Sequence, residues 1–163
     1  MSTRPLQIFF VALALLANGC FGLKLPRPAV TSSAFFDQAQ NFHQDIQRIV
    51  IEKGCTLSSS GSGVSSGSGS NGFSGNRNFY VELRGSKEAV DKVMLALKAE
   101  LERLAKRHGA TIGAAGEDGA AGSPLLGFHF DYAIGDALGH VSAKLEGGPE
   151  SYQLSLGMQE KVP

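Results

Sequence analysis

Histidine and carboxylate side chains come together at one place in the sequence. His129 and Asp131 are two residues apart, and in a β-strand this spacing places both side chains on the same face of a sheet. His140 belongs to the next predicted strand and can join them. A metal site needs three or four converging ligands with supporting hydrogen bonds. The three residues are therefore an incomplete set of metal or acid–base candidates, and the competing interpretation is a solvated polar face of a sheet.

Two other patterns suggest chemistry but have simpler explanations. Glu117 and Asp118 form a carboxylate pair that could bind Ca²⁺ or transfer protons, but they lie in a glycine-rich segment without EF-hand spacing, so we predict a turn. The segment from Gly67 to Gly72 matches the G-x-G-x-x-G pattern of dinucleotide-binding loops. No helix is predicted after Gly72, and a Ser/Gly tract produces this pattern by chance. We therefore predict no nucleotide and no cofactor.

The composition argues against further classes of function. The 163 residues include 15 Lys and Arg against 15 Asp and Glu, so the basic excess of a nucleic-acid-binding protein is missing. The sequence contains no H-E-x-x-H, C-x-x-C or Walker pattern. We predict no catalytic residue, while an enzyme of another type stays an alternative. An apolar content of 42% is typical of a chain that folds.

The first 19 residues have the three parts of a secretory signal peptide. Arg4 provides a positive charge, Ile8 to Ala17 form an unbroken apolar run, and small residues follow. The run is shorter than the ~20 residues that cross a ~30 Å hydrocarbon core. We predict a signal peptide over residues 1–19, with an uncut membrane anchor or a buried helix of the domain as the alternatives.

The end of this segment, Ala17-Asn18-Gly19-Cys20, resembles the lipobox of bacterial lipoproteins, although Ala17 and Asn18 differ from its commonest form. The resemblance implies that the Cys20 thiol is acylated and becomes the new N-terminus, which would hold the protein at a membrane. Residues 20–32 include two prolines and are predicted to form a tether.

The fate of the two cysteines depends on processing. If a general signal peptidase cuts after Gly19, the product is a free secreted protein in which a Cys20–Cys55 disulfide is conceivable. Gly22 offers a second cut point, which would remove Cys20. The other interpretation of Cys55 is a small buried apolar residue at the start of a strand.

Two amphipathic helices are predicted. Apolar residues recur at steps of three and four over residues 33–53 and again over residues 86–108. A serine stands at the start of each segment, where its side chain can cap the helix. Gly54 and Gly109 follow the two segments and are suited to end the helices.

The other segments predict an antiparallel sheet of about six strands, over residues 55–58, 78–84, 110–114, 125–134, 137–146 and 151–158. Serine and glycine dominate residues 58–76, so we predict a disordered insertion there. The expected fold is a single α+β domain over residues 33–163. It is a two-layer sandwich of order α-β-β-α-β-β-β-β with both helices on one face of the sheet.

The function expected from these features is that of a non-enzymatic binding or structural protein, exported and tethered to a membrane through Cys20. In a bacterium it would be a periplasmic or surface lipoprotein of the cell envelope, and otherwise a secreted protein. One alternative is a secreted metal-dependent hydrolase that uses His129, Asp131 and His140. Another is a carrier of a small ligand or lipid, with its pocket between the second helix and the sheet.

Overall fold

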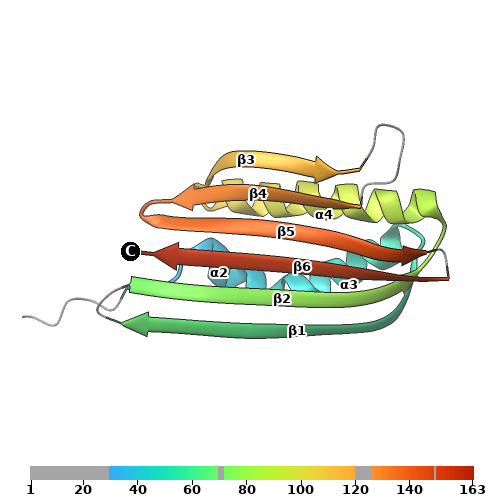
Figure 1. The fold of residues 1–163 in the computed structure, drawn as a ribbon, viewed down its shortest axis with the longest axis horizontal. Helices are drawn as coiled ribbons and strands as arrows, with labels where there is room; N and C mark the ends of the chain where they lie inside the picture. Colours follow the sequence, from blue (N-terminus) through green and yellow to red (C-terminus); the bar gives the residue numbers. More distant parts are fainter. Residues whose placement is uncertain (1–29, 70–71, 120–125, 149) are drawn as a thin grey trace, which may run out of the picture.

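The computed structural model describes residues 30–69, 72–119, 126–148 and 150–163. The helical elements are α2 (Ala34–Gln38), the 3₁₀ turn η1 (Ala39–Asn41), α3 (Phe42–Glu52) and α4 (Lys87–Arg107). The strands are β1 (Thr56–Gly69), β2 (Gly72–Arg84), β3 (Thr111–Asp118), β4 (Gly127–Ile134), β5 (Ala137–Gly148) and β6 (Ser151–Val162). The predicted α+β fold and its order of elements are confirmed (Figure 1). The predicted signal peptide, Cys20 and the first part of the predicted tether lie outside the described residues.

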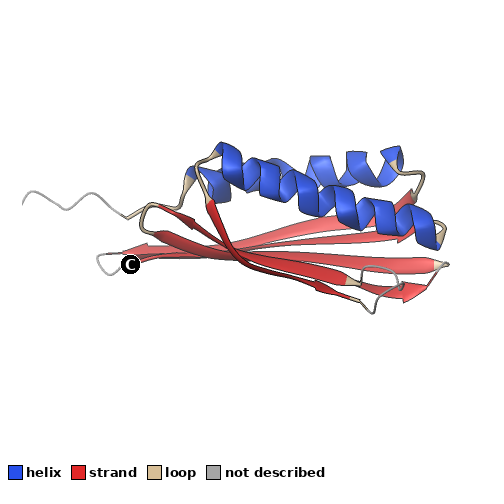
Figure 2. Cartoon of the chain, turned by 90° about the horizontal axis from the view of Figure 1, so that it is seen from above, coloured by secondary structure: helices blue, strands red, loops and turns tan. Residues whose placement is uncertain are grey.

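All six strands form one antiparallel sheet in the order β1-β2-β6-β5-β4-β3. The C-terminal strand β6 therefore lies inside the sheet, between β2 and β5. The helices lie together on one face of the sheet, as predicted (Figure 2). None of the described helices covers the opposite face, which we call the open face.

The helices begin and end at residues suited to these positions. Ser33 and Ser86 cap α2 and α4, and each side chain accepts a hydrogen bond at 3.2 Å from the backbone N–H three residues later. Gly54 and Gly109 follow α3 and α4 with φ angles of 84° and 77°, a left-handed conformation that glycine adopts without strain. The first predicted helix is interrupted only by η1, a single 3₁₀ turn.

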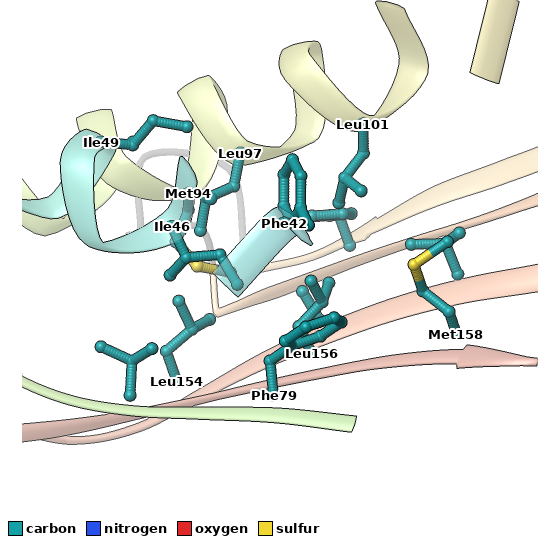
Figure 3. Packing of buried hydrophobic residues seen from close by; sticks show 14 of the residues in the cluster. Phe42, Ile46, Ile49, Phe79, Met94, Leu97, Leu101, Leu154, Leu156 and Met158 are labelled. Atoms are coloured by element: carbon teal, nitrogen blue, oxygen red, sulfur yellow. The ribbon is translucent and has the colours of Figure 1, made fainter. Parts of the chain in front are cut away.

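The hydrophobic core lies between the helices and the inner face of the sheet (Figure 3). Ile46 of α3 and Leu97 and Leu101 of α4 have no exposed surface. They belong to one cluster with inward-facing side chains of the central strand β6, including Leu154 and Leu156. Burying one such side chain contributes about 1.5–3 kcal/mol. The apolar stripes predicted for both helices are thus confirmed as their core faces.

The prediction that residues 58–76 form a disordered insertion is wrong for the described part of that segment. β1 pairs with β2 along its whole length, with one register shift near its start. Strand pairing uses backbone hydrogen bonds, which serine and glycine form as other residues do. Side-chain composition alone therefore did not reveal this strand. β2 contributes the buried apolar side chains, and Ser60 of β1 accepts a hydrogen bond from Gln47 of α3 at 2.8 Å.

The turn predicted at Glu117 and Asp118 is also wrong. β3 extends to Asp118 and pairs with β4, with a register shift between Ile112 and Ala115. β6 likewise continues past its predicted end, to Val162. These strands are longer than predicted because a strand ends where its pairing partner ends, which local composition does not reveal.

Candidate functional site on the open face of the sheet

The open face of the sheet carries mainly polar side chains. Side chains alternate across a strand, so the residues between the buried ones point away from the helices. In the central strands these outward residues are Asn76, Asn78 and Tyr80 of β2, Ser155, Gly157 and Gln159 of β6, His140, Ser142 and Lys144 of β5, and His129 and Asp131 of β4. Hydroxyl, amide, imidazole and charged groups therefore lie side by side on one accessible surface.

A shallow depression of about 590 Å³ lies in the middle of the open face, with Gly157 of β6 among its lining residues. A Cβ atom added to Gly157 would stand 3.5 Å from Ser142 Oγ and 3.6 Å from Asn78 Oδ1, so these two side chains flank the glycine. Tyr80, which is 58% exposed, and Lys144 also line the depression. The site combines hydrogen-bonding groups with one aromatic surface, a combination that suits a polar ligand with a small apolar part.

The structure brings together the three residues that the sequence singled out. His140 Nδ1 lies 2.7 Å from Asp131 Oδ1, and the imidazole donates this hydrogen bond because a carboxylate only accepts. The rings of His129 and His140 are inclined to each other by 27°, with centroids 6.1 Å apart. Both histidines line the depression. Because Nδ1 of His140 is engaged by Asp131, Nε2 is the ring nitrogen available to a ligand.

These residues do not converge as metal ligands do. Within the described ranges, no group of three or more His, Cys, Asp or Glu side chains is placed to hold a metal ion. His140 and Asp131 bind each other, and about half of each side chain is exposed to solvent. The ring of His129 instead lies against Gly116 of β3, where any added side chain would collide with it. The cluster can donate and accept hydrogen bonds, and this is the chemistry that its geometry favours.

Glu117 and Asp118 lie on opposite faces of the sheet. Glu117 faces the helices and forms an ion pair with Lys98 of α4, with 2.5 Å between Nζ and Oε1. Asp118 lines the depression on the open face. Because consecutive strand residues point in opposite directions, the two carboxylates cannot act on one ligand.

The charges around the depression are mixed in sign. Lys144 Nζ lies 2.5 Å from Glu146 Oε1 on the same strand. This hydrogen bond raises the pKa of Lys144 and lowers the pKa of Glu146, so both groups are charged at neutral pH. Solvent screens this exposed pair. With Asp118 and Asp131 nearby, the site favours neither a strongly cationic nor a strongly anionic ligand.

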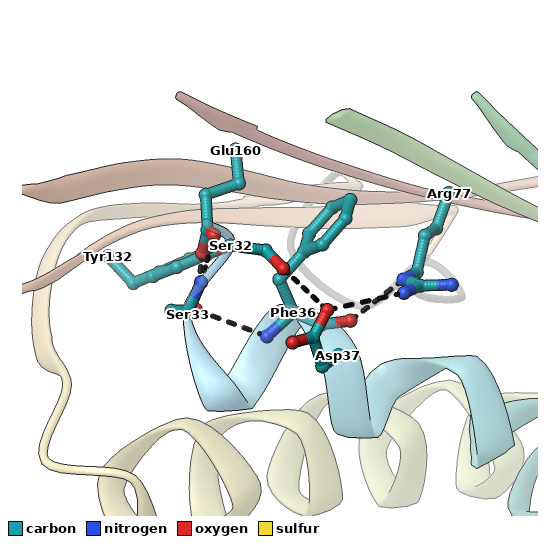
Figure 4. A network of polar contacts seen from close by, with 7 residues as sticks. All are labelled: Ser32, Ser33, Phe36, Asp37, Arg77, Tyr132 and Glu160. Carbon is teal, nitrogen blue, oxygen red and sulfur yellow. Dashed lines mark hydrogen bonds and ion pairs between the residues drawn. The ribbon is translucent and has the colours of Figure 1, made fainter. Parts of the chain in front are cut away.

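A second carboxylate of the sheet faces the helices and, unlike that of Glu117, is buried. Glu160 of β6 is only 2% exposed and accepts hydrogen bonds from the Ser33 N–H at 2.6 Å, the Ser33 hydroxyl at 2.5 Å and the Tyr132 hydroxyl at 2.9 Å (Figure 4). Gly139 of β5 lies between Tyr132 and Glu160, and a side chain there would collide with the Tyr132 ring. Burial, and then the neighbouring carboxylate, raise the pKa of Tyr132 well above its ordinary value. This network joins the start of α2 to the sheet.

A second set of contacts holds the same segment to β2 (Figure 4). Arg77 Nε donates a hydrogen bond to the Phe36 carbonyl at 2.7 Å, and its guanidinium lies 4.7 Å from the centre of the Phe36 ring. Arg77 also lies 3.8 Å from Asp37, which accepts a hydrogen bond from the Ser32 hydroxyl at 2.5 Å. The start of α2 is thus held firmly, at the end of the sheet where the C-terminus lies (Figure 1).

Cys55 is a free thiol, buried just before β1. Burial raises the pKa of this thiol and so disfavours the reactive thiolate. The sulfur lies close to Gly85, where an added Cβ would stand 2.7 Å away. Cys55 therefore occupies the place of a small buried apolar residue, and its predicted alternative partner, Cys20, lies outside the described residues.

Two glycine–serine patterns lack the structural setting that their chemistry requires. The G-x-G-x-x-G pattern ends at Gly72, which begins strand β2 and not a helix. β1 also contains a G-x-S-x-G pattern from Gly63 to Gly67, the sequence of a nucleophile elbow. That motif acts at a sharp strand-to-helix turn, whereas Ser65 lies inside an extended strand.

Sequence reasoning found the histidines of the open face but did not single out Asn78, Tyr80, Ser142 or Gly157, which also line the depression. A signal for them exists, since each alternates with buried residues along its strand. The missing information was the position of β6 between β2 and β5, which places Gly157 between Asn78 and Ser142.

The fold and the site together define a two-layer α+β domain with an open polar sheet face. No known protein family matches the sequence, and no curated protein matches it. None of the helices in the described part of the chain is both long and apolar enough to cross a membrane.

Proposed function

We propose that the protein is exported, is held at a membrane by an acylated Cys20, and acts there as a non-enzymatic binding or structural protein of the cell envelope. The observation that carries the binding role is the open face of the sheet, with its polar depression beside Gly157. The signal-like residues 1–19 and the resemblance of residues 17–20 to a lipobox support export and tethering.

The geometry of the N-terminal side fits a tethered domain. The start of α2 is anchored to the sheet through Glu160 and Arg77. These contacts would keep the first helix in place when force acts on the tether. A tether over residues 20–32 spans at most roughly 45 Å when fully extended. An acyl chain contributes about 0.8 kcal/mol per buried CH₂ group, so stable attachment needs more than one chain. The domain would then present its open face to partners close to the membrane.

Intact mass measurement of the native protein tests the tether. We expect the protein in the membrane fraction, with a mass that begins at Cys20 and includes added acyl chains. The Cys20→Ser variant should appear without acyl chains, and at least the larger part of it should leave the membrane fraction. An unmodified wild-type mass that begins at Cys20 or Leu23, recovered from the soluble fraction, would show that the protein is freely secreted and that the proposed tether does not exist.

A metal-dependent hydrolase is the second candidate, favoured by the His140–Asp131 hydrogen bond beside the depression. Because these residues do not converge, we expect no stoichiometric zinc binding in a calorimetric titration of the native protein. The His129→Ala variant serves as the control and should give the same titration curve as the wild type. Binding of one zinc ion per chain that is lost in His129→Ala would favour the hydrolase instead.

A carrier of a small ligand would use a different place from the one predicted. The space between α4 and the sheet is filled by Met94, Leu97 and Leu101, which are fully buried. The depression on the open face would then be the ligand site.

A further inference from the structure

The two edges of the sheet differ in how they are protected against pairing with another strand. β3, at one edge, is short, carries a register shift near Ile112 and ends with Glu117 and Asp118. Irregularity, shortness and charge are the features by which edge strands avoid edge-to-edge association. β1, at the other edge, has 14 residues without a charged side chain or a proline. Among the described residues its outer edge pairs with no strand.

No steric contact within one chain requires glycine at these positions of β1. A Cβ added to Gly61, Gly63 or Gly67 would have no neighbour within 4 Å, and none of the three has a positive φ. Glycine in a strand weakens it and often marks a place where another backbone approaches closely. The same strand carries one apolar residue beyond Leu57, namely Val64, which lies near its middle and is 62% exposed.

We propose that β1 pairs antiparallel with β1 of a second copy of this chain, about a two-fold axis near Val64. This arrangement joins the two six-stranded sheets into one continuous sheet. The unpaired backbone groups of β1 are then satisfied, and the two Val64 side chains cover each other on the helix side of the sheet. With the axis at Val64, residues 59–63 of one copy face residues 65–69 of the other, and all of these are serine or glycine. Neither steric conflict nor like-charge repulsion therefore opposes the pairing.

A second copy fits this edge better than an unrelated partner. A charged residue at the axis would face its own copy and be repelled by it, so an uncharged edge strand favours self-pairing. β1 meets this condition over its whole length. Because the β3 edge is protected, pairing stops at two copies, as expected for a closed symmetric dimer.

Sedimentation velocity of the native protein, purified in mild detergent, tests this proposal over a wide range of protein concentration. We expect a reversible dimer for the wild type. The Val64→Glu variant places two carboxylates at the axis while its own cross-strand neighbour is Arg77, so it should fold and should weaken dimerisation on the order of tenfold. The control, Leu95→Glu, likewise replaces an exposed aliphatic residue with glutamate, but on α4, and should dimerise like the wild type. Urea unfolding confirms that each variant is folded.

A cysteine at position 64 tests the register directly. Directly opposed residues of antiparallel strands have Cα atoms about 4.5–5.5 Å apart, a separation that a disulfide can bridge. Mild oxidation should therefore convert Val64→Cys, but not Leu95→Cys or the wild type, into a covalent dimer. A wild type that is monomeric at every concentration, or a Val64→Glu variant that dimerises like the wild type, would overturn the proposal. A dimer in which Val64→Cys does not crosslink would overturn the axis near Val64.

Discussion

Replacing Glu160 with alanine is expected to lower the free energy of unfolding by about 3 kcal/mol. Glu160 is buried, and its carboxylate accepts hydrogen bonds from the Ser33 backbone N–H, the Ser33 hydroxyl and the Tyr132 hydroxyl. Alanine would leave these three donors without this acceptor, and an unsatisfied buried donor costs about 1–3 kcal/mol. Urea unfolding at neutral pH, followed by circular dichroism, measures the change.

Two control variants separate the loss of these hydrogen bonds from the loss of charge. Glu160→Gln keeps one side-chain acceptor and should lose less stability than Glu160→Ala. Glu146→Ala removes an exposed carboxylate of the neighbouring strand and should change the stability by no more than about 0.5 kcal/mol. If Glu160→Ala is as stable as Glu146→Ala, the carboxylate does not anchor the start of α2 to the sheet.

Replacing Phe79 with alanine should lower the free energy of unfolding by about 3–5 kcal/mol. Phe79 of β2 is 2% exposed, and its ring lies edge-on to Phe42 of α3, with centroids 6.5 Å apart. Truncation removes this contact and leaves a cavity between α3 and the sheet, which the close-packed surroundings fill only partly. Thermal and urea unfolding of the purified variant give the change.

The neighbouring residue provides the matched control. Tyr80 follows Phe79 in the same strand but lies on the open face, so Tyr80→Ala should change the stability by no more than about 0.5 kcal/mol. The contrast between two adjacent aromatic residues tests which face of β2 is buried. Equal losses in the two variants would contradict the assignment of the open face.

The part of the fold that the sequence alone determined is the part that depends on local patterns. The helices over Ala34–Glu52 and Lys87–Arg107 follow from apolar residues at helical spacing, serine caps and terminal glycines. The three C-terminal strands follow from alternating apolar residues separated by glycine turns. In each case the residues that decide the structure are near neighbours in the sequence, so the pattern can be read directly.

Only the tertiary structure decided the features that depend on distant residues. β1 is a strand because β2 pairs with it, although its serines and glycines have little intrinsic strand preference. Glu160 can be buried because Ser33 and Tyr132 donate hydrogen bonds to it from far away in the sequence. The depression exists because β6 lies between β2 and β5, which sets Gly157 between Asn78 and Ser142. Strand order is chosen by the packing of the whole core, and no local pattern encodes it.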